Sequence, residues 1–405
     1  MRVSSLPDRL KKAALALAVS GLSALAVLPA AARAADTLRP DVAKPLNDAQ
    51  TLYRAHNYQG ALGKIAQAAA VPNKTPYETY MVEEMRGAAA MAAGENGVAA
   101  QAYESLLASG QLKGAEEQQT TAALAGLYFQ QKNYAQAIKV AQRYQKAGGT
   151  DAQMGTLLVE SYYLSGDYAS AVRLLNASVD SQVRAGHVPD EEQLQLLGTC
   201  AQHANDQGAY RGALEKLVAY HPKQSYWDDL LHSVRSKPGY LGALDVDTYR
   251  LRRATGSLTT ADDYMEMTQL ALVSGSTAEG KQVIDQGFAS GVLGHDAQAD
   301  REHRLQALAA KRTQSGADQN GNPVAPFDAA FNQVFAGQAQ QGIAAMQALI
   351  AKGGLDHLDL AQLRLGEAYY FAGQKAKAVQ VFRNVKGTDG SADLAQLWIL
   401  VASKS

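Results

Sequence analysis

One sequence pattern recurs along most of this chain at intervals of about 36 residues. Each copy begins with an apolar and aromatic segment, which a short turn containing Gly, Asp, Asn or Tyr follows. After the turn comes a small residue, and four positions later a large apolar residue. The clearest copies cover residues 158–175 and 365–382. A repeat of this length predicts stacked supersecondary units, because each unit can bury its apolar face only against its neighbours.

The small residue that opens the second half of each copy sets the register of the repeats. Successive copies are separated by 38, 38, 34, 42, 67, 62 and 36 residues. The aligned small residues are Ala61, Ala99, Ala137, Ala171, Ala213, Gly280, Gly342 and Ala378. A second small residue is expected twelve positions earlier, because two antiparallel helices cross closely only where a side chain is small. The residues at those positions are Ala49, Gly87, Ala125, Val159, Ala201, Thr268, Ala330 and Gly366.

In this register the chain resembles the tetratricopeptide repeat superfamily, whose period is 34 residues. The resemblance is strongest over residues 115–180 and 356–386 and weakest over residues 221–355. It implies an all-α, right-handed superhelical solenoid of antiparallel helix pairs, whose inner concave face binds a protein or peptide without catalysis. The two long steps are predicted to hold extra or degenerate helices, including residues 245–254 and 299–311.

The pattern divides the chain into five predicted segments. They are a signal peptide (1–34), an N-terminal repeat array (35–220), irregular or degenerate helical repeats (221–313), a loop or hinge (314–326), and C-terminal repeats with a capping helix (327–405). The loop is inferred from its Gly, Asn, Asp and Pro residues. The capping helix is expected over residues 392–402, because the end of a repeat array otherwise leaves apolar surface exposed.

The first 34 residues have the three parts of a secretory signal peptide. Basic residues at positions 2, 9, 11 and 12 precede an uncharged apolar run of 16 residues, and Ala32-Arg33-Ala34 matches the cleavage pattern. The alternative is an uncleaved anchor, but the run is short for a membrane span of about 20 residues. We therefore expect cleavage near Ala34, a periplasmic protein, and no stable membrane insertion of the mature chain.

Charge and cysteine content constrain partners and stabilising bonds. Cleavage would remove five basic residues and one acidic residue, which changes the formal charge from −1 to −5. Nucleic acid is therefore not an expected partner. Helical spacing places Arg250, Arg252 and Arg253 on different faces, so we expect them to be solvated. The single cysteine, Cys200, cannot form an internal disulfide and is expected to be a buried, inert thiol.

No pattern of catalytic or metal-binding residues stands out, so the sequence predicts no enzyme activity, cofactor or metal site. The chain has no His-Glu-x-x-His motif, no cysteine pair and no Gly-rich phosphate loop. His295 and His303 lie near acidic residues, but the sequence offers no third ligand at suitable spacing. The acidic pair at 228 and 229 follows Tyr226 and Trp227, which could form a carbohydrate cleft; an acidic helix start is the preferred interpretation.

The resemblance also implies which residues would contact a partner. In tetratricopeptide arrays, residues eleven and eight positions before the aligned small residue project from the first helix into the concave face. The partner-binding candidates are Tyr53, Phe129, Glu160, Tyr163, Gln202 and Tyr370, and Glu367 occupies an equivalent position. Aromatic, amide and carboxylate side chains together suit an extended peptide or an amphipathic helix. The alternative is that these aromatic side chains pack on the next repeat. The Lys and Asn pattern of the carboxylate-clamping members is absent.

Two classes of function fit these observations. The first is an exported, non-enzymatic scaffold that binds a protein or peptide in cell-envelope machinery. The second is a glycan-binding factor in polysaccharide export or cell-wall metabolism, since tyrosines can stack on sugars; the chain has only two tryptophans, however. Self-association through Leu397, Trp398 and Leu400 is a further hypothesis, although capping the last repeat would use the same residues.

Overall fold

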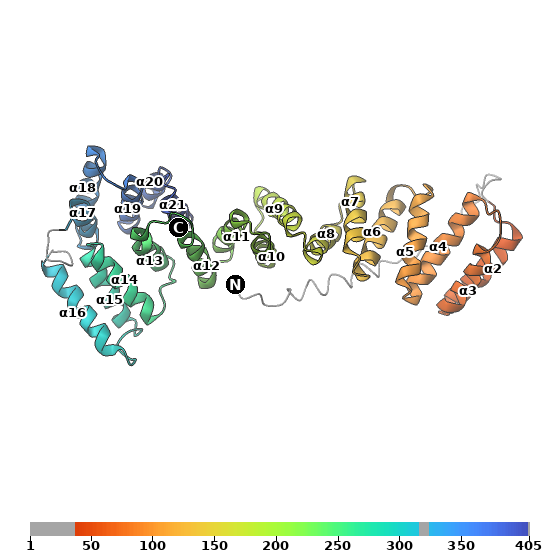
Figure 1. Cartoon of the computed structure of the whole chain (residues 1–405), viewed down its shortest axis with the longest axis horizontal. Coiled ribbons are helices and arrows are strands. Elements are labelled where there is room, and N and C mark those ends of the chain that lie inside the picture. The colour runs from red at the N-terminus through yellow and green to blue at the C-terminus, as the bar shows by residue number, and fades with distance from the viewer. Residues whose placement is uncertain (1–36, 316–323, 404–405) are drawn as a thin grey trace. The chain divides into compact units, whose positions relative to one another are not determined.

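The computed structural model describes residues 37–315 and 324–403 (Figure 1). These residues form α-helices, one 3-10 helix and connecting turns, and no strand occurs among them. The all-α prediction is therefore confirmed. The predicted signal peptide and most of the predicted loop at 314–326 lie outside the described residues.

The chain forms two compact units, with the boundary after Tyr210, inside helix α11 (Gln207–Tyr220). We describe each unit by itself, and the five predicted segments stay predictions. The helices that precede the boundary are α2 (Pro40–Arg54), α3 (Tyr58–Ala69), α4 (Pro76–Ala93), α5 (Asn96–Ala108), α6 (Gly114–Gln130), α7 (Tyr134–Lys146), α8 (Ala152–Ser165), α9 (Tyr168–Arg184) and α10 (Glu191–His203).

The C-terminal unit contains the irregular region and the last repeats. The helices predicted over residues 245–254 and 299–311 are present as α13 and α16, so both predictions are confirmed. The elements are α12 (Gln224–Arg235), η1 (Gly242–Leu244), α13 (Asp245–Ala254), α14 (Ala261–Val273), α15 (Thr277–Ala289), α16 (Ala299–Ser315), α17 (Pro326–Phe335), α18 (Ala339–Lys352), α19 (Leu358–Phe371), α20 (Lys375–Phe382) and α21 (Ser391–Ala402).

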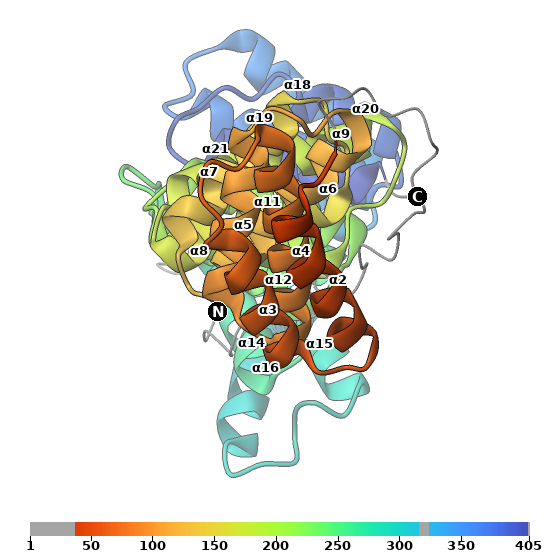
Figure 2. The ribbon, with the colours of Figure 1, turned by 90° about the vertical axis from the view of Figure 1, so that its right-hand side faces the viewer.

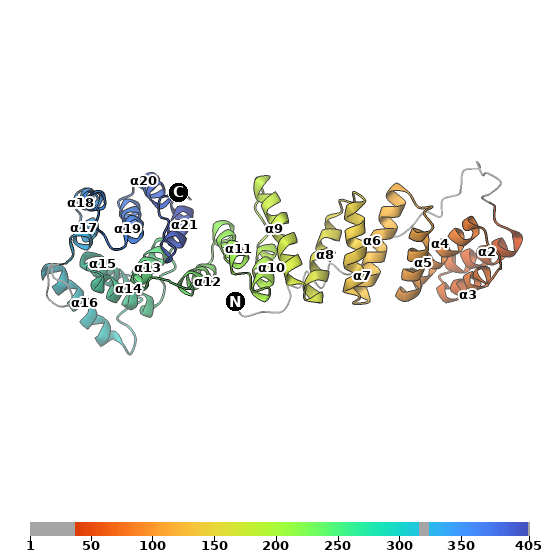
Figure 3. The same ribbon diagram turned by 45° about the horizontal axis from the view of Figure 1, so that its top comes forward.

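Consecutive helices pack as antiparallel pairs within each unit. The most extensive contacts join α2 to α3, α4 to α5 and α6 to α7, and in the C-terminal unit α14 to α15, α17 to α18 and α19 to α20. Figures 1 and 3 show the first three pairs side by side, and Figure 2 views them from the end at which α2 and α3 are nearest. Each pair therefore buries its apolar surface against the next pair, as the repeat pattern predicts.

The turns inside three pairs share one local structure. Asn57, Asn133 and Asp167 each cap the second helix, because the side-chain oxygen accepts a hydrogen bond from the backbone N–H three residues later, at 3.0, 3.4 and 3.1 Å. The residue before each cap has a positive φ, of 58° at His56, 58° at Lys132 and 82° at Gly166. This left-handed residue reverses the chain between the two helices.

The small residues lie where the two helices of a pair cross. A Cβ atom added to Gly366 would lie 2.4 Å from Cε1 of Phe382, and one added to Gly87 would lie 2.5 Å from Cε1 of Tyr103. At Gly342, the added atom would lie 2.4 Å from the backbone oxygen of Ala330. At Gly342 the neighbouring atom belongs to the backbone, so this close crossing requires glycine, whereas at Gly366 and Gly87 the neighbouring ring would have to shift.

Replacing Gly342 with alanine should therefore destabilise the C-terminal unit. The backbone of α17 cannot rotate away as a side chain can, so we expect the free energy of unfolding to fall by about 1–3 kcal/mol. Gly212→Ala is the matched control, because nothing lies within 4 Å of its added Cβ in α11, and it should stabilise by up to about 1 kcal/mol. Urea unfolding followed by tryptophan fluorescence measures both; equal effects of the two substitutions would contradict this account of the crossing.

A buried charge network joins four helices of the C-terminal unit. Arg250 of α13 is fully buried, so the prediction that it is solvated is wrong. Its guanidinium lies 2.6 Å from Asp247, 2.7 Å from Glu279 of α15 and 3.3 Å from Glu367 of α19. It also lies 4.3 Å from the ring centroid of Phe331 in α17. The helix face that carries Arg250 is covered by neighbouring helices, which the local sequence of α13 does not indicate.

Glu367 belongs to this network and does not face a groove. Its side chain is fully buried and accepts a hydrogen bond of 3.0 Å from Nε1 of Trp398. Burial, together with the nearby carboxylate of Asp247, raises the pKa of Glu367 well above its ordinary value. The expected groove position of Glu367 is therefore wrong, because Arg250 of α13 and Trp398 of α21 contact its side chain.

The last helix caps the C-terminal repeats. Helix α21 covers residues 391–402, against a prediction of 392–402, and packs on α19 and α20. Trp398 is fully buried, with its ring stacked 5.8 Å from that of Phe382 at an interplanar angle of 9°. Leu397 is buried too. These two side chains are used in the cap, and self-association stays a prediction.

Candidate binding site

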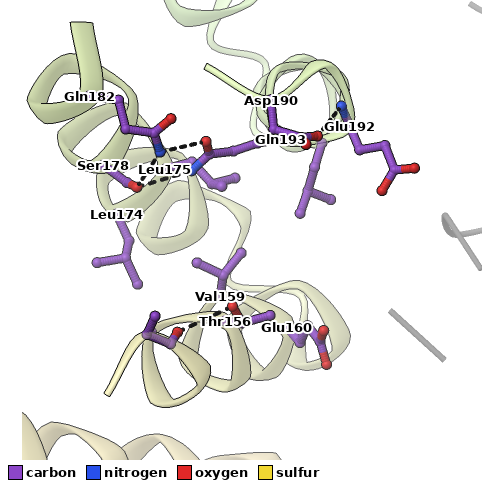
Figure 4. Close-up of a pocket in the computed structure, with 13 residues that line it drawn as sticks. Thr156, Val159, Glu160, Leu174, Leu175, Ser178, Gln182, Asp190, Glu192 and Gln193 are labelled. Carbon is purple, nitrogen blue, oxygen red and sulfur yellow. Dashed lines mark hydrogen bonds between the residues drawn. The ribbon is translucent and has the colours of Figure 1, made fainter. Parts of the chain in front are cut away.

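A pocket of about 610 Å³ lies between α8, α9 and α10 in the N-terminal unit (Figure 4). Its apolar wall consists of Val159, Leu174, Leu175 and Leu196, and its polar lining includes Thr156, Glu160, Ser178, Gln182, Asp190, Glu192 and Gln193. Pockets of this volume commonly hold small ligands or a few residues of a bound segment.

The pocket opens where one close helix crossing is missing. Val159 occupies the position that carries alanine or glycine in the three preceding pairs, and Leu175 occupies the large position across from it. Helices α8 and α9 pack less extensively than the pairs α2/α3, α4/α5 and α6/α7. Figure 4 shows Val159 pointing from α8 into the space between the three helices. Two branched side chains meet at this crossing. They keep α8 away from α9, because neither leaves a groove that the other helix can enter.

The long helix α9 forms a second wall of the pocket. This helix has 17 residues, whereas the second helices α3, α5 and α7 have 12, 13 and 13. Its extra turn carries Gln182 beside the start of α10, where Gln182 Nε2 donates a hydrogen bond of 2.9 Å to Gln193 Oε1. Gln193 Nε2 in turn donates to Ser178 Oγ at 3.0 Å. These bonds fix α9 against α10 and leave α8 as the separated wall.

Glu160 is a buried carboxyl in the lining of the pocket. Glu160 is only 4% exposed, and its Oε1 atom has no hydrogen-bond partner. Burial raises the pKa of Glu160 to about 7, because the charged form loses its water of solvation. The other titratable groups that line the pocket are Asp190 and Glu192, and the lining contains no lysine, arginine or histidine. A neutral or half-ionised carboxyl therefore lies in a pocket that lacks a compensating cation.

Two other predicted site residues lie on helices that line the pocket, but outside its lining. Tyr163 follows Glu160 by one turn on α8 and contacts the rings of Tyr168, at 5.5 Å, and His203, at 6.4 Å. Tyr168 and His203 stack on each other at 4.6 Å. Gln202 is half-buried on α10, directly before His203. The structure thus places Glu160, Tyr163 and Gln202 on the neighbouring helices α8 and α10.

The other aromatic candidates lie apart from this pocket. Tyr53 on α2 contacts Tyr58 at 5.4 Å, and Phe129 on α6 contacts Tyr134 at 5.7 Å. Each aromatic thus packs edge-to-face across the turn of its own pair, an arrangement that Tyr163 shares. Tyr370, in the C-terminal unit, packs 4.8 Å from Trp398. Tyr53, Phe129, Tyr163 and Tyr370 are all half-buried. Their role in binding stays a prediction.

Sequence reasoning did not identify the polar wall formed by Ser178, Gln182 and Gln193. The available signal was the 42-residue step from Ala171 to Ala213, which is longer than the three steps before it. That extra length forms the last turns of α9 and the connection to α10. Cys200, by contrast, is buried as predicted, and burial raises the pKa of its thiol to about 12.

Paired antiparallel helices, capped turns and small residues at the crossings are the defining features of one repeat architecture. The fold is tetratricopeptide-like. The handedness of the superhelix stays a prediction.

The solved structures that resemble this chain have low sequence identity to it. No protein-family model and no curated protein matches the chain. Among solved structures, the TPR2AB domain of yeast Sti1 in its pHSP90 complex is 13% identical, with a TM-score of 0.24, over 72% of this chain and 100% of that chain. The P58(IPK) TPR domain is 13% identical, with a TM-score of 0.23, over 90% and 100%. The structure of Naa15/Naa10 bound to HypK-THB is 13% identical, with a TM-score of 0.32, over 87% and 58%.

Between residues 37 and 403, with the gap at 316–323, no helix is long and apolar enough to cross a membrane. Over the same residues, no group of three or more His, Cys, Asp or Glu side chains is arranged to hold a metal ion.

The raised pKa of Glu160 predicts a pH-dependent stability. Between pH 4.5, the ordinary pKa of a glutamate, and about pH 7, Glu160 keeps its proton in the folded chain but releases it in the unfolded chain. Stability from this group is therefore complete below pH 4.5 and is lost as pH rises through about 7, by about 3 kcal/mol in total. Glu160→Gln removes this dependence and should stabilise the protein at pH 8 but not at pH 4.

Far-UV circular dichroism during urea unfolding at both pH values measures this difference. Glu117→Gln is the control, since Glu117 is partly exposed on α6 and pairs with Arg143 at 3.0 Å. Its effect should be below about 1 kcal/mol at both pH values. An unchanged difference between wild type and Glu160→Gln across this pH range would contradict the assignment of the raised pKa.

Proposed function

We propose that this chain is an exported, non-enzymatic scaffold that binds a segment of a protein partner at the pocket between α8, α9 and α10. The observation that carries the proposal is a pocket whose lining includes Glu160, a buried carboxyl with no hydrogen-bond partner at Oε1. Folded proteins rarely leave a buried carboxyl oxygen without a partner, because desolvation of a polar group is costly. A bound partner would supply the missing interaction.

The surroundings of the pocket favour a protein segment as the ligand. Leucine and valine side chains offer an apolar wall, and amide and hydroxyl groups lie beside it. Tyr163 continues the same face of α8 and is half-buried, so its ring can anchor a partner beyond the pocket. A groove between helices with these groups suits an extended or helical peptide.

The proposed location is the periplasm, and the proposed role lies in cell-envelope machinery. Support comes from the sequence pattern of residues 1–34, which has a basic start, an apolar run and an Ala-x-Ala site. The partner would then be another exported or membrane-attached protein.

Photo-crosslinking in cells tests this proposal. A photoreactive residue replaces Tyr163 in one variant and Thr156, on the pocket wall, in a second variant. The control position is Lys139, which is exposed on α7. We expect one recurrent protein adduct from both test positions and none from Lys139, as judged by mass spectrometry. Absence of a protein adduct from both test positions would contradict the proposal and favour a glycan ligand.

A further inference from the structure

The pocket lacks a cation but has three carboxyl groups in its lining. Glu160 lies on the α8 side, and Asp190 and Glu192 lie at the start of α10 (Figure 4). Asp190 is partly engaged, because its Oδ1 atom accepts a hydrogen bond of 2.9 Å from the backbone N–H of Glu192. Glu160 has no such partner at Oε1. Glu160 is therefore the carboxyl that a positive group would neutralise, whereas a negative group would be repelled by it.

We infer that the pocket selects a basic side chain of the bound segment, lysine or arginine, whose cationic end pairs with Glu160. This inference rests on the proposed function and specifies the chemistry that the partner must carry. A charge-assisted hydrogen bond from an ammonium or guanidinium group would satisfy Oε1 and hold the carboxyl in its ionised form.

The apolar wall fits the rest of such a side chain. Val159, Leu174, Leu175 and Leu196 line the same pocket as Glu160. Lysine and arginine carry three or four methylene groups below their charge, and these groups pack well on aliphatic surface. A hydrated metal ion would gain little from such a wall, since hard cations need six or more oxygen ligands. The combination of a leucine wall and one buried carboxyl therefore points to an organic cation with an aliphatic stem.

Other side chains would leave the pocket unsatisfied. An aliphatic residue would fill the apolar space but leave the buried Glu160 without a partner, which is costly. A glutamate or aspartate would add a fourth carboxyl to the site. The pocket would discriminate against such residues for two reasons. They leave the buried carboxyl of Glu160 unpaired, and they lack the attraction that a basic side chain has for it.

Binding of synthetic peptide pools to the full mature chain tests the inference. Each pool holds 12-residue peptides with random flanks and one fixed central residue: lysine, arginine, norleucine or glutamate. Titration calorimetry at pH 8 compares the pools on wild type, on Glu160→Gln and on Glu84→Gln. Glu84 is the matched control, because it is a partly buried glutamate whose pKa is also raised by burial but it lies on α4, outside the pocket. Spermidine, a free aliphatic polyamine, serves as a further probe.

The expected result is that lysine and arginine pools bind wild type about tenfold more tightly than the norleucine pool. This preference should disappear in Glu160→Gln and persist in Glu84→Gln. Equal binding of all four pools, or a preference that survives Glu160→Gln, would overturn the inference while leaving peptide binding intact. Failure of every pool to bind wild type would overturn the proposed function itself. Glu160-dependent binding of spermidine without binding of the lysine or arginine pools would overturn the assignment to a peptide side chain.

Discussion

Replacing Arg250 with alanine is expected to lower the free energy of unfolding of the C-terminal unit by about 3–5 kcal/mol. The substitution leaves Asp247, Glu279 and Glu367 buried without the cation that now contacts all three. Breaking a buried network by removing one partner is costly, because the remaining charges stay desolvated. It also removes the contact of the guanidinium with the ring of Phe331.

Tryptophan fluorescence reports on this unit alone, since both tryptophans, Trp227 and Trp398, lie after Tyr210. Lys281→Ala is the matched control, because Lys281 forms an exposed pair with Asp285 four residues later and should change stability by less than about 1 kcal/mol. Arg250→Lys should lie between these two, since an ammonium cannot reproduce the planar bonds to Glu279. A loss below about 1 kcal/mol for Arg250→Ala would show that the network contributes little.

Replacing Trp398 with alanine is expected to cost about 3–5 kcal/mol in the same unit. The fully buried ring fills the space between Phe382 and Tyr370, and its Nε1 donates to Glu367. Its removal would leave both a cavity and an unpartnered buried carboxyl oxygen. Trp398→Phe keeps most of the packing but loses the hydrogen bond, so it should cost less than alanine.

Trp227 remains as the single fluorophore in both Trp398 variants, so the same urea experiment measures them. Light scattering on the same variants measures their oligomeric state, because self-association through α21 is a hypothesis from the sequence. Equal stability of wild type and Trp398→Ala would contradict the capping role of α21. A dimer that dissociates in Trp398→Ala without a loss of stability would instead support self-association.

The architecture was predictable because it depends on local pattern. Small residues at crossings, capped turns at Asn57, Asn133 and Asp167, and the helices at 245–254 and 299–315 are encoded within a few turns of sequence. Repeat spacing then supplies the neighbour of each helix. The capping helix was predictable for the same reason, since an apolar helix with a buried Trp398 follows the last repeat.

The charge network was not predictable in this way. Arg250 and Glu367 are 117 residues apart in the sequence and meet at 3.3 Å. A local reading of α13 shows a basic, polar helix, which is typical of a solvated face. Side chains of α15, α17 and α19 contact this arginine and leave it buried.

The candidate site was partly predictable. Glu160 was identified from its register position, and the structure places it in the pocket lining. The pocket itself depends on two departures from the repeat, Val159 at a small position and the long step after Ala171. Each departure is visible in the sequence, but the cavity arises only when α8, α9 and α10 are packed together. The aromatic pairs across turns, such as Tyr163 with Tyr168, have a constant spacing of five residues that the sequence also contains.

Hydrogen–deuterium exchange of a chain covering residues 35–405, with and without the partner captured by crosslinking, tests whether the pocket between α8, α9 and α10 is the binding site. The account predicts that protection from exchange is concentrated in residues 152–203, the segment that contains α8, α9 and α10. It also predicts that Glu160→Gln weakens this protection at equal partner concentration. Protection confined to the C-terminal unit, with residues 152–203 unchanged, would contradict the assignment of the binding site.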